Sequence, residues 1–426
     1  MGEMTVEQIK KKRMVFLVLS TVTLLFLGLI YAFSMFAAPM CESFGLEKSQ
    51  IGITFYIMMI MFCLGCVAGA FIEKRIGVKL SIIIAAILYA FGFIGTAFLA
   101  NGNIAVVYIL YGVCAGAGVG IGYNSIIATT NIWFPDKVGF SSGILMMGFG
   151  IGSLIFGTAG VTMYNSGMSL SIVFTIIGAV GGALTVFEGI MLRRPPADIV
   201  SIMMPDKVSA SGYDPAEDDK PLKTPLFYVY WVWGIIVIGI GLAIIGNIAA
   251  DAQLVGWEAG FATLLVGLVS TCNGLARVVI GIIYDKTNVK VTMLVGASIA
   301  VVSTVCITCS FVFGIPILFV IGAFCCGFCY GGVPVVASAF ARQRFGAKNY
   351  PTNLSLVNFA IVPGALLNLL IQAIVGADAR QTIFIILVVL AVIAVLDVIP
   401  FSKMFNKSQK VLEERRAAHE AGEQAN

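Results

Sequence analysis

The chain has 426 residues, of which 59% are hydrophobic and only 11% are charged. Its mean hydropathy of +1.00 lies far outside the balance of soluble globular domains, so the composition excludes that class and predicts an integral membrane protein. The formal net charge of +4 gives no indication of a nucleic-acid partner.

Apolar stretches long enough to cross a bilayer, about 20 residues each, follow one another along the chain. Charged or Pro/Gly-rich breaks separate them, and none shows the two-residue alternation of a membrane β-strand. We therefore predict an all-α membrane protein with twelve transmembrane helices, over about residues 14–40, 49–72, 79–100, 104–132, 139–164, 169–192, 226–250, 258–284, 290–313, 315–341, 351–376 and 380–402.

The first span follows a basic segment, Lys10 to Arg13, as the apolar core of a signal peptide would. Its apolar stretch continues to about Pro39, which is too long for such a core, so we expect a retained helix. Lysine and arginine are distributed unevenly between the loops. With the N-terminus inside, 23 of the 26 fall on the cytoplasmic side, which predicts cytoplasmic termini in a multi-pass protein of the cell (plasma or inner) membrane.

Few residues here support enzyme chemistry. The only histidine is His419 in the polar tail, which removes Ser-His-Asp and His-metal schemes. Three Cys-x-x-Cys pairs lie inside predicted helices and fit packing better than a metal or redox role. No Gly-Lys-Ser/Thr motif supports ATP-driven pumping. We expect no enzyme activity, no cofactor and no metal.

The longest loop, residues 193–225, is polar, contains six prolines and includes the acidic stretch DPAEDDK, which is typical of a linker. The segments GAFIEKRIGVK (69–79) and GIIYDKTNVK (281–290) both begin Gly-x-x-x-acid and are offset by 212 residues. This parallel repeat predicts two pseudo-symmetric six-helix bundles. The expected domains are an N-terminal bundle, a cytoplasmic linker, a C-terminal bundle and a cytoplasmic tail, at 1–192, 193–225, 226–402 and 403–426.

Twelve spans in two halves, with the 69–79 loop pattern after the second span, resemble the major facilitator superfamily. Within it, residues 115–143, the stretch AKNYPTN (347–353) and Arg277 resemble the oxalate–formate antiporter group and its monocarboxylate-transporter relatives. The resemblance implies a monomeric secondary transporter of small organic anions that works by alternating access.

Arg277 is the one basic residue that lies inside a span and away from its ends. It precedes Asp285 by eight residues, so it lies about 12 Å from the cytoplasmic end of its helix. A charge at that depth costs about 3 to more than 10 kcal/mol unless a counterion or cavity relieves it. The acids inside spans are Glu188 and Asp397, each close to a cytoplasmic basic residue, in helices that the resemblance makes peripheral. The substrate is therefore the expected counterion; a structural ion pair is the alternative.

A guanidinium group offers two parallel N–H groups to a carboxylate, which fits a small carboxylate substrate. The resemblance implies that Tyr31, Tyr123 and Tyr330 line the cavity, and packing or a membrane-interface position is the alternative for each. Further polar candidates are Asn124, Asn273 and Asn358, which can also join helices.

Two departures from the family bear on the substrate. The second cation of oxalate–formate exchangers is absent, since Val357 and Asn358 stand at that place in helix eleven, and this favours a monocarboxylate of the lactate, pyruvate or formate class. Asn273 replaces the aspartate of proton-coupled carriers, so protons, a counter-anion or neither are all left open as the coupled species. Exchange of an oxalate-type dicarboxylate and a transport-fold sensor are the alternatives.

The two repeated loops predict a cytoplasmic gate. Charge contacts of Glu73 with Lys74 and Arg75, and of Asp285 with Lys286, would latch the inner side when the cavity opens outward. The alternative role for these charges is to set the membrane topology. The predicted gate residues are Gly69, Glu73, Arg75, Gly281, Asp285 and Lys286.

Overall fold

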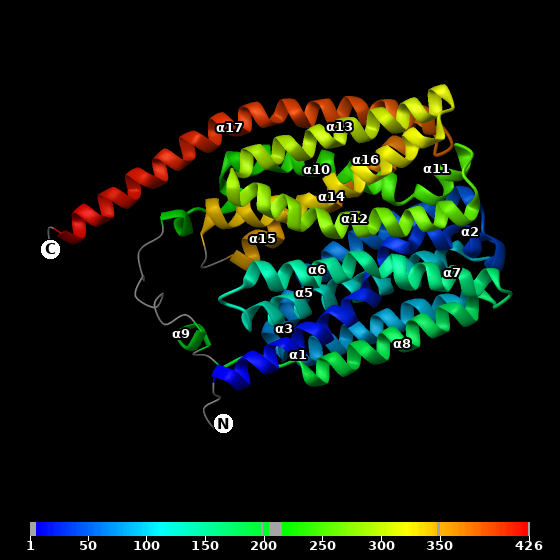
Figure 1. Ribbon diagram of the computed structural model, residues 1–426, viewed down its shortest axis with the longest axis horizontal. Helices are drawn as coiled ribbons and strands as arrows, with labels where there is room; N and C mark the ends of the chain where they lie inside the picture. The colour runs from blue at the N-terminus through cyan, green and yellow to red at the C-terminus, as the bar shows by residue number, and fades with distance from the viewer. Residues whose placement is uncertain (1–5, 197–198, 204–214, 347–349, 425–426) are drawn as a thin grey trace. The chain divides into compact units, whose positions relative to one another are not determined.

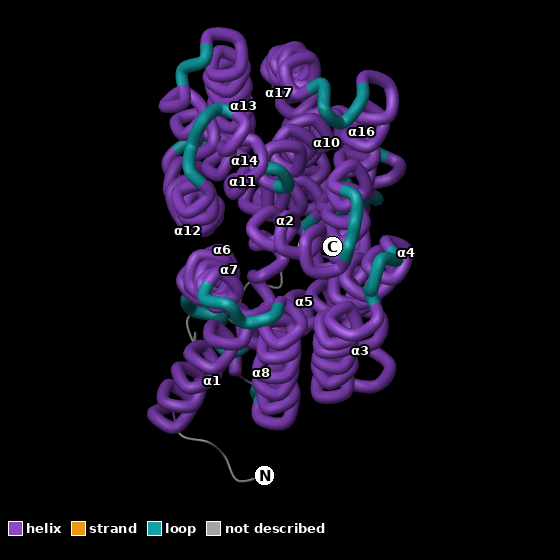
Figure 2. The backbone as a smooth tube through the Cα atoms, turned by 90° about the vertical axis from the view of Figure 1, so that its right-hand side faces the viewer, coloured by secondary structure: helices purple, strands orange, loops and turns teal. Residues whose placement is uncertain are grey.

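A computed structural model describes residues 6–196, 199–203, 215–346 and 350–424. These residues form helices joined by loops and turns and contain no strand, which confirms the all-α prediction (Figures 1 and 2). Packing divides the chain into two compact units, residues 1–209 with 245–275 and residues 210–244 with 276–426. The division into domains at a central linker stays a prediction.

The helices of the first part of the chain are α1 (Val6–Leu27), η1 (Gly28–Ala32), α2 (Phe33–Phe44), α3 (Lys48–Leu99), α4 (Ile104–Val107), η2 (Tyr108–Ala115), α5 (Gly116–Ile132), α6 (Val138–Gly152), η3 (Ser153–Gly157), α7 (Thr158–Asn165), α8 (Leu170–Met191) and α9 (Ile199–Met203). Those of the rest are η5 (Pro215–Asp218), η6 (Pro221–Lys223), α10 (Pro225–Ile245), α11 (Ile248–Leu254), α12 (Ala259–Lys286), α13 (Val289–Phe313), α14 (Pro316–Phe345), α15 (Tyr350–Asn358), α16 (Ile361–Val375) and α17 (Arg380–Gln424).

Eleven helical runs in the described residues are long and apolar enough to cross a membrane. One of them, Gln50–Leu99, has 50 residues, which at 1.5 Å per residue is about 75 Å and more than twice the thickness of the hydrocarbon core. Gly77 interrupts this run with φ +84°, a conformation that favours glycine. The run therefore contains the second and third predicted spans, and the count agrees with twelve.

The eleventh predicted span, 351–376, is broken rather than continuous, because α15 ends at Asn358 and α16 begins at Ile361. Pro363 explains the break: it has no N–H, and its ring would collide with the carbonyl of residue 359 in a continuous helix. The seventh predicted span, 226–250, is likewise divided, between α10 and α11.

Both ends of the chain are more helical than the apolar pattern alone indicates. The first helix begins at Val6, so it includes the basic segment before the first span, and α17 continues to Gln424 through the predicted tail. The tail is rich in Glu, Lys, Arg, Gln and Ala, which are strong helix formers. Helix α17 therefore continues through the whole described part of the tail.

Glycines bring α3 and α5 close together in the first unit. A Cβ atom at Gly69 would lie 3.1 Å from Ile121 Cα, and one at Gly116 would lie 2.7 Å from the carbonyl oxygen of Met58. The small residues noted in the fourth predicted span thus allow close helix packing, as expected for membrane helices.

Candidate functional site

Helix α12 carries the two polar groups at the centre of the candidate site. Arg277 is 5% exposed and lies nine residues before the last residue of the helix, Lys286. Asn273 is fully buried and lies one turn before Arg277, so the two side chains leave the same face of the helix. Neither Oδ1 nor Nδ2 of Asn273 has a hydrogen-bonding partner among the described residues.

A buried amide without a hydrogen-bonding partner destabilises the folded protein. Its lost hydration costs about 1–3 kcal/mol, and most buried polar groups in folded proteins are hydrogen-bonded. Asn273 therefore presents one acceptor and two donors that a bound polar molecule can satisfy.

The backbone of α6 holds α12 in place beside Asn273. Ser270 Oγ donates a hydrogen bond of 2.7 Å to the carbonyl oxygen of Gly150. A Cβ atom at Gly150 would lie 2.8 Å from Gly274 Cα, so the two helices meet at backbone distance. Such a glycine contact leaves little freedom for this part of α12 to move against α6.

Two predicted tyrosines meet on one phenylalanine ring. Phe149 of α6 lies 5.5 Å from the ring of Tyr31 in η1 and 4.7 Å from the ring of Tyr123 in α5. Phe62 of α3 adds a further ring 5.4 Å from Tyr123. Asn124, next to Tyr123, is half-buried.

Sequence reasoning did not identify Phe149 or Phe62. The available signal was an aromatic residue set directly between two glycines of the glycine-rich stretch 143–157, since Phe149 lies between Gly148 and Gly150, the glycine that contacts α12. Phe149 contacts both tyrosines, and the next residue, Gly150, contacts α12 at Ser270 and Gly274, on either side of Asn273.

The second unit contains Arg277, Tyr330 and Asn358. Tyr330 of α14 is 6% exposed, and its ring packs directly against the backbone of α10 at Gly241. Asn358 is the last residue of α15 and stands, half-buried, just before the break in the eleventh span.

The two acids inside spans form no ion pair within the described residues. Glu188 is fully buried, and its carboxylate accepts hydrogen bonds from Ser20 Oγ at 2.7 Å and Thr23 Oγ1 at 3.4 Å. The Oδ2 atom of Asp397 is buried and has no hydrogen-bonding partner in the described part of the chain. The structural pair that would join either acid to Arg277 is therefore not observed.

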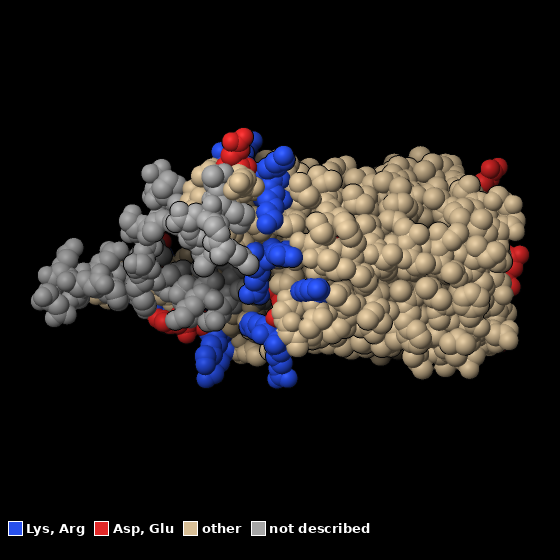
Figure 3. Space-filling view, turned by 90° about the horizontal axis from the view of Figure 1, so that it is seen from below, with Lys and Arg blue, Asp and Glu red and all other residues tan. Residues whose placement is uncertain are grey.

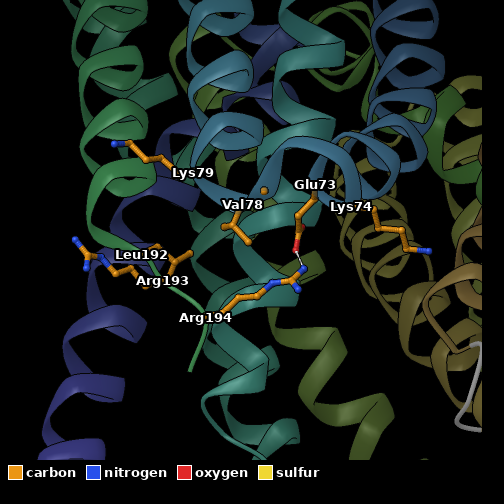
Figure 4. Close-up of a pocket in the computed structure, with 8 residues that line it drawn as sticks. Glu73, Lys74, Val78, Lys79, Leu192, Arg193 and Arg194 are labelled. Carbon is orange, nitrogen blue, oxygen red and sulfur yellow. Dashed lines mark hydrogen bonds and ion pairs between the residues drawn. The ribbon is translucent and has the colours of Figure 1, made fainter. Parts of the chain in front are cut away.

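Among the predicted gate residues, Glu73 pairs with a residue other than the expected Lys74 and Arg75. Glu73 is 9% exposed and accepts a 2.6 Å hydrogen bond from Arg194 (Figure 4). Lys74 and Arg75 are exposed. Residues one and two positions apart on a helix do not face each other, so neither is placed to pair with Glu73. Gly281 is half-buried, Lys286 is exposed, and the side chain of Asp285 lies outside the described residues.

The last described part of the linker, residues 215–225, belongs to the second unit and is held there by an ion pair. Asp219 accepts hydrogen bonds from Arg344 of α14 at 2.7 Å and from Arg415 of α17 at 3.2 Å. Partial burial acts to raise the pKa of Asp219, but the hydrogen bonds and charges of the two arginines outweigh it and lower the pKa below its usual value. The acidic stretch of the linker thus provides a specific ion-pair contact.

Comparison with known proteins agrees with this architecture. The family model described as Major Facilitator Superfamily matches residues 17–209 and 226–420. The chain belongs to the Major Facilitator Superfamily. Members of this superfamily are membrane transporters of small molecules, and the solved structures similar to this chain agree on the fold. The inward open xylose transporter XylE from E. coli has a TM-score of 0.71 at 15% identity and covers 91% of this chain and 96% of its own.

Curated relatives within the Major Facilitator Superfamily include the oxalate:formate antiporter of Oxalobacter formigenes, which is 27% identical over 273 residues. That match covers 63% of this chain and 62% of the antiporter. The chain therefore spans less than two thirds of the length of this relative. The MFS-type transporter YhjX of Escherichia coli K12, which is uncharacterized, is 24% identical over 83% of this chain and 86% of its own.

Proposed function

We propose that the protein is a secondary active transporter of small organic anions, chiefly monocarboxylates of the lactate, pyruvate or formate class, that works by alternating access. The observation that carries the proposal is the face of α12 with buried Arg277 and an unpartnered amide at Asn273. A guanidinium holds a carboxylate by two parallel hydrogen bonds, and the amide adds a third polar contact.

The location of Arg277 distinguishes it from the other buried arginines. Arg13 and Arg344 are also buried in the described residues, but Arg13 precedes the first predicted span, Arg344 follows the tenth, and each pairs with an aspartate, Asp136 or Asp219. Arg277 lies within the apolar part of its span, where ionisable residues are functional by default.

The names of the relatives are compatible with carboxylates. One is an oxalate:formate antiporter, and the apicoplast pyruvate carrier 1 of Toxoplasma gondii is 31% identical over 93 residues, 22% of this chain and 17% of the carrier. Asn358 and Val357 provide no second cation in the eleventh span, which favours one carboxylate over two. Exchange of an oxalate-type dicarboxylate is the second candidate, supported by the antiporter relative.

Radiolabelled counterflow in proteoliposomes tests the proposal. We expect lactate, pyruvate or formate trapped inside the vesicles to drive accumulation of the labelled monocarboxylate, and oxalate to drive less. Faster exchange with oxalate would replace the first candidate by the second. Binding without flux, seen as thermal stabilisation by a carboxylate in detergent, would identify a sensor instead and reject transport. An imposed pH gradient in the same vesicles tests coupling to protons.

A further inference from the structure

A pocket of about 430 Å³ opens where α3 turns at Gly77 beside the end of α8. Its charged lining consists of one acid and four cations, Glu73, Lys74, Lys79, Arg193 and Arg194 (Figure 4). The formal balance of this lining is therefore positive by three charges.

The single acid neutralises one particular cation. Arg194 Nη2 lies 2.6 Å from Glu73 Oε1, and neither Lys79 nor Arg193 forms an ion pair with an acid in the described part of the chain. Figure 4 shows the side chains of Lys79 and Arg193 extending to the same side of the pocket, whereas Lys74 extends to the other. Two cations thus share one side of the pocket without an acidic partner among the described residues.

Exposed apolar surface adjoins these two cations. Helices α3 and α8 pack closely there, since a Cβ atom at Gly189 would lie 3.1 Å from the carbonyl oxygen of Lys79. Large apolar side chains on the outer faces of both helices are exposed beside the pocket and beyond it: Leu80 (48%), Ile87 (60%), Phe187 (50%) and Ile190 (49%). Lysine and arginine side chains gather in a band near one end of the helices on the face that Figure 3 draws.

We propose that this pocket binds the headgroup of an anionic phospholipid, with its phosphate between Lys79 and Arg193 and its acyl chains along the exposed faces of α3 and α8. A phosphate takes two or more charge-assisted hydrogen bonds from such a pair. Basic pockets between transmembrane helices on the cytoplasmic side suit acidic headgroups, and this is the predicted cytoplasmic end of both helices. A soluble anion would use the cations but not the apolar surface. The inference is independent of the transported substrate.

The test measures lipid binding to the purified full chain by native mass spectrometry, with phosphatidylglycerol and phosphatidylcholine as the two probes. We expect preferential retention of phosphatidylglycerol and a loss of about 30-fold in its affinity in the double variant Lys79→Gln/Arg193→Gln. That factor corresponds to about 1 kcal/mol for each of the two cations. The matched control is Lys403→Gln/Lys407→Gln on α17, which removes two exposed charges outside the pocket and should retain the preference.

Two further measurements complete the test. The first distinguishes a lipid phosphate from a soluble one, and the second uses a single variant that is expected to fold normally. Inorganic phosphate should not raise the apparent melting temperature of the wild type; stabilisation equal to that by phosphatidylglycerol, and equally lost in the double variant, would assign a soluble anion instead. The single variant Arg193→Gln removes an exposed side chain and should show an intermediate loss. Unchanged phosphatidylglycerol binding in both the single and the double variant would overturn the proposal.

Discussion

Glu188 in α8 and Asn273 in α12 are both fully buried polar side chains inside membrane-spanning helices, and they differ in what surrounds them. Around Glu188, Ser20 and Thr23 of α1 donate to the carboxylate, and Ser20 also bonds Thr130 of α5 at 2.9 Å. Asn273 has no such partner within the described residues. The first group is satisfied by the fold, whereas the second is available to a ligand.

The neighbouring helices explain the difference. Ser20 and Thr23 are three residues apart on α1, so their hydroxyls reach the same side of that helix. Next to Asn273 along α12, Gly274 meets Gly150 of α6 at backbone distance, and a glycine has no side chain that could donate or accept a hydrogen bond.

The largest expected effect comes from Arg277. Arg277→Gln should nearly abolish carboxylate uptake, and Arg277→Lys should weaken it strongly, since a charge-assisted hydrogen bond contributes about 1.5–3 kcal/mol, or roughly 10- to 150-fold in affinity. Uptake into proteoliposomes measures this, with the exposed Lys10→Gln as control. Neutralising Glu188 or Asp397 in addition should not restore uptake; recovery in either double variant would favour a structural ion pair.

At Glu188 we expect loss of stability rather than of substrate binding. Glu188→Ala leaves buried hydroxyls without an acceptor and should lower the free energy of unfolding by about 1–3 kcal/mol. Glu188→Gln keeps an acceptor oxygen and should cost less. Melting temperatures in detergent, together with substrate affinity, separate the two roles. A Glu188→Gln protein of normal stability but without substrate binding would contradict the assignment of Glu188 to the fold.

Asn273 should show the opposite pattern. Asn273→Leu removes an unpartnered buried amide, so the melting temperature should stay the same or rise, while substrate affinity falls about 2- to 10-fold. The matched control is Asn368→Leu, because Asn368 Nδ2 donates 2.7 Å and 3.1 Å hydrogen bonds to the carbonyl oxygens of Gly239 and Gly364. That control should lose stability. Equal destabilisation by both variants would remove the distinction between them.

Glu73 tests whether a partnered charge near the bend of α3 at Gly77 controls conformation. Glu73→Gln loses the ion pair with Arg194 and should change the transport rate and the balance of inward and outward states, with substrate selectivity intact. Arg194→Gln removes the same pair from its other side and should give a similar result. Accessibility of introduced cysteines measures the balance. Altered selectivity in either variant would argue against a gate.

The smallest expected effect is the pH dependence of the linker contact. The arginines lower the pKa of Asp219, so the folded state binds this proton less tightly than the unfolded state. The stabilisation is therefore complete above the usual aspartate value of about 4 and is lost as pH falls through the lower folded value. Since the contact is partly exposed, its contribution should be about 1 kcal/mol or less. Hydrogen exchange of residues 215–223 as a function of pH measures it, and Asp219→Asn should remove the dependence.

Sequence by itself determined the membrane class, the helical content and the superfamily. The thickness of the bilayer requires spans of about 20 apolar residues, so each span can be identified from a short stretch of sequence. The depth of Arg277 in its helix could also be predicted from the sequence, because the rise per residue of an α-helix is fixed. Glycine runs indicated close packing without showing which helix they would contact.

Tertiary structure alone decided which polar groups have partners. Arg194 is 121 residues from Glu73, and Ser20 is 168 residues from Glu188, so no local pattern relates them. The role of Phe149 can be recognised only in the folded chain, where η1 and α5 place Tyr31 and Tyr123 against its ring. Hydrogen-bond satisfaction is a property of the atoms that surround a group in three dimensions, and this is why Glu188 and Asn273 could not be told apart before the fold was known.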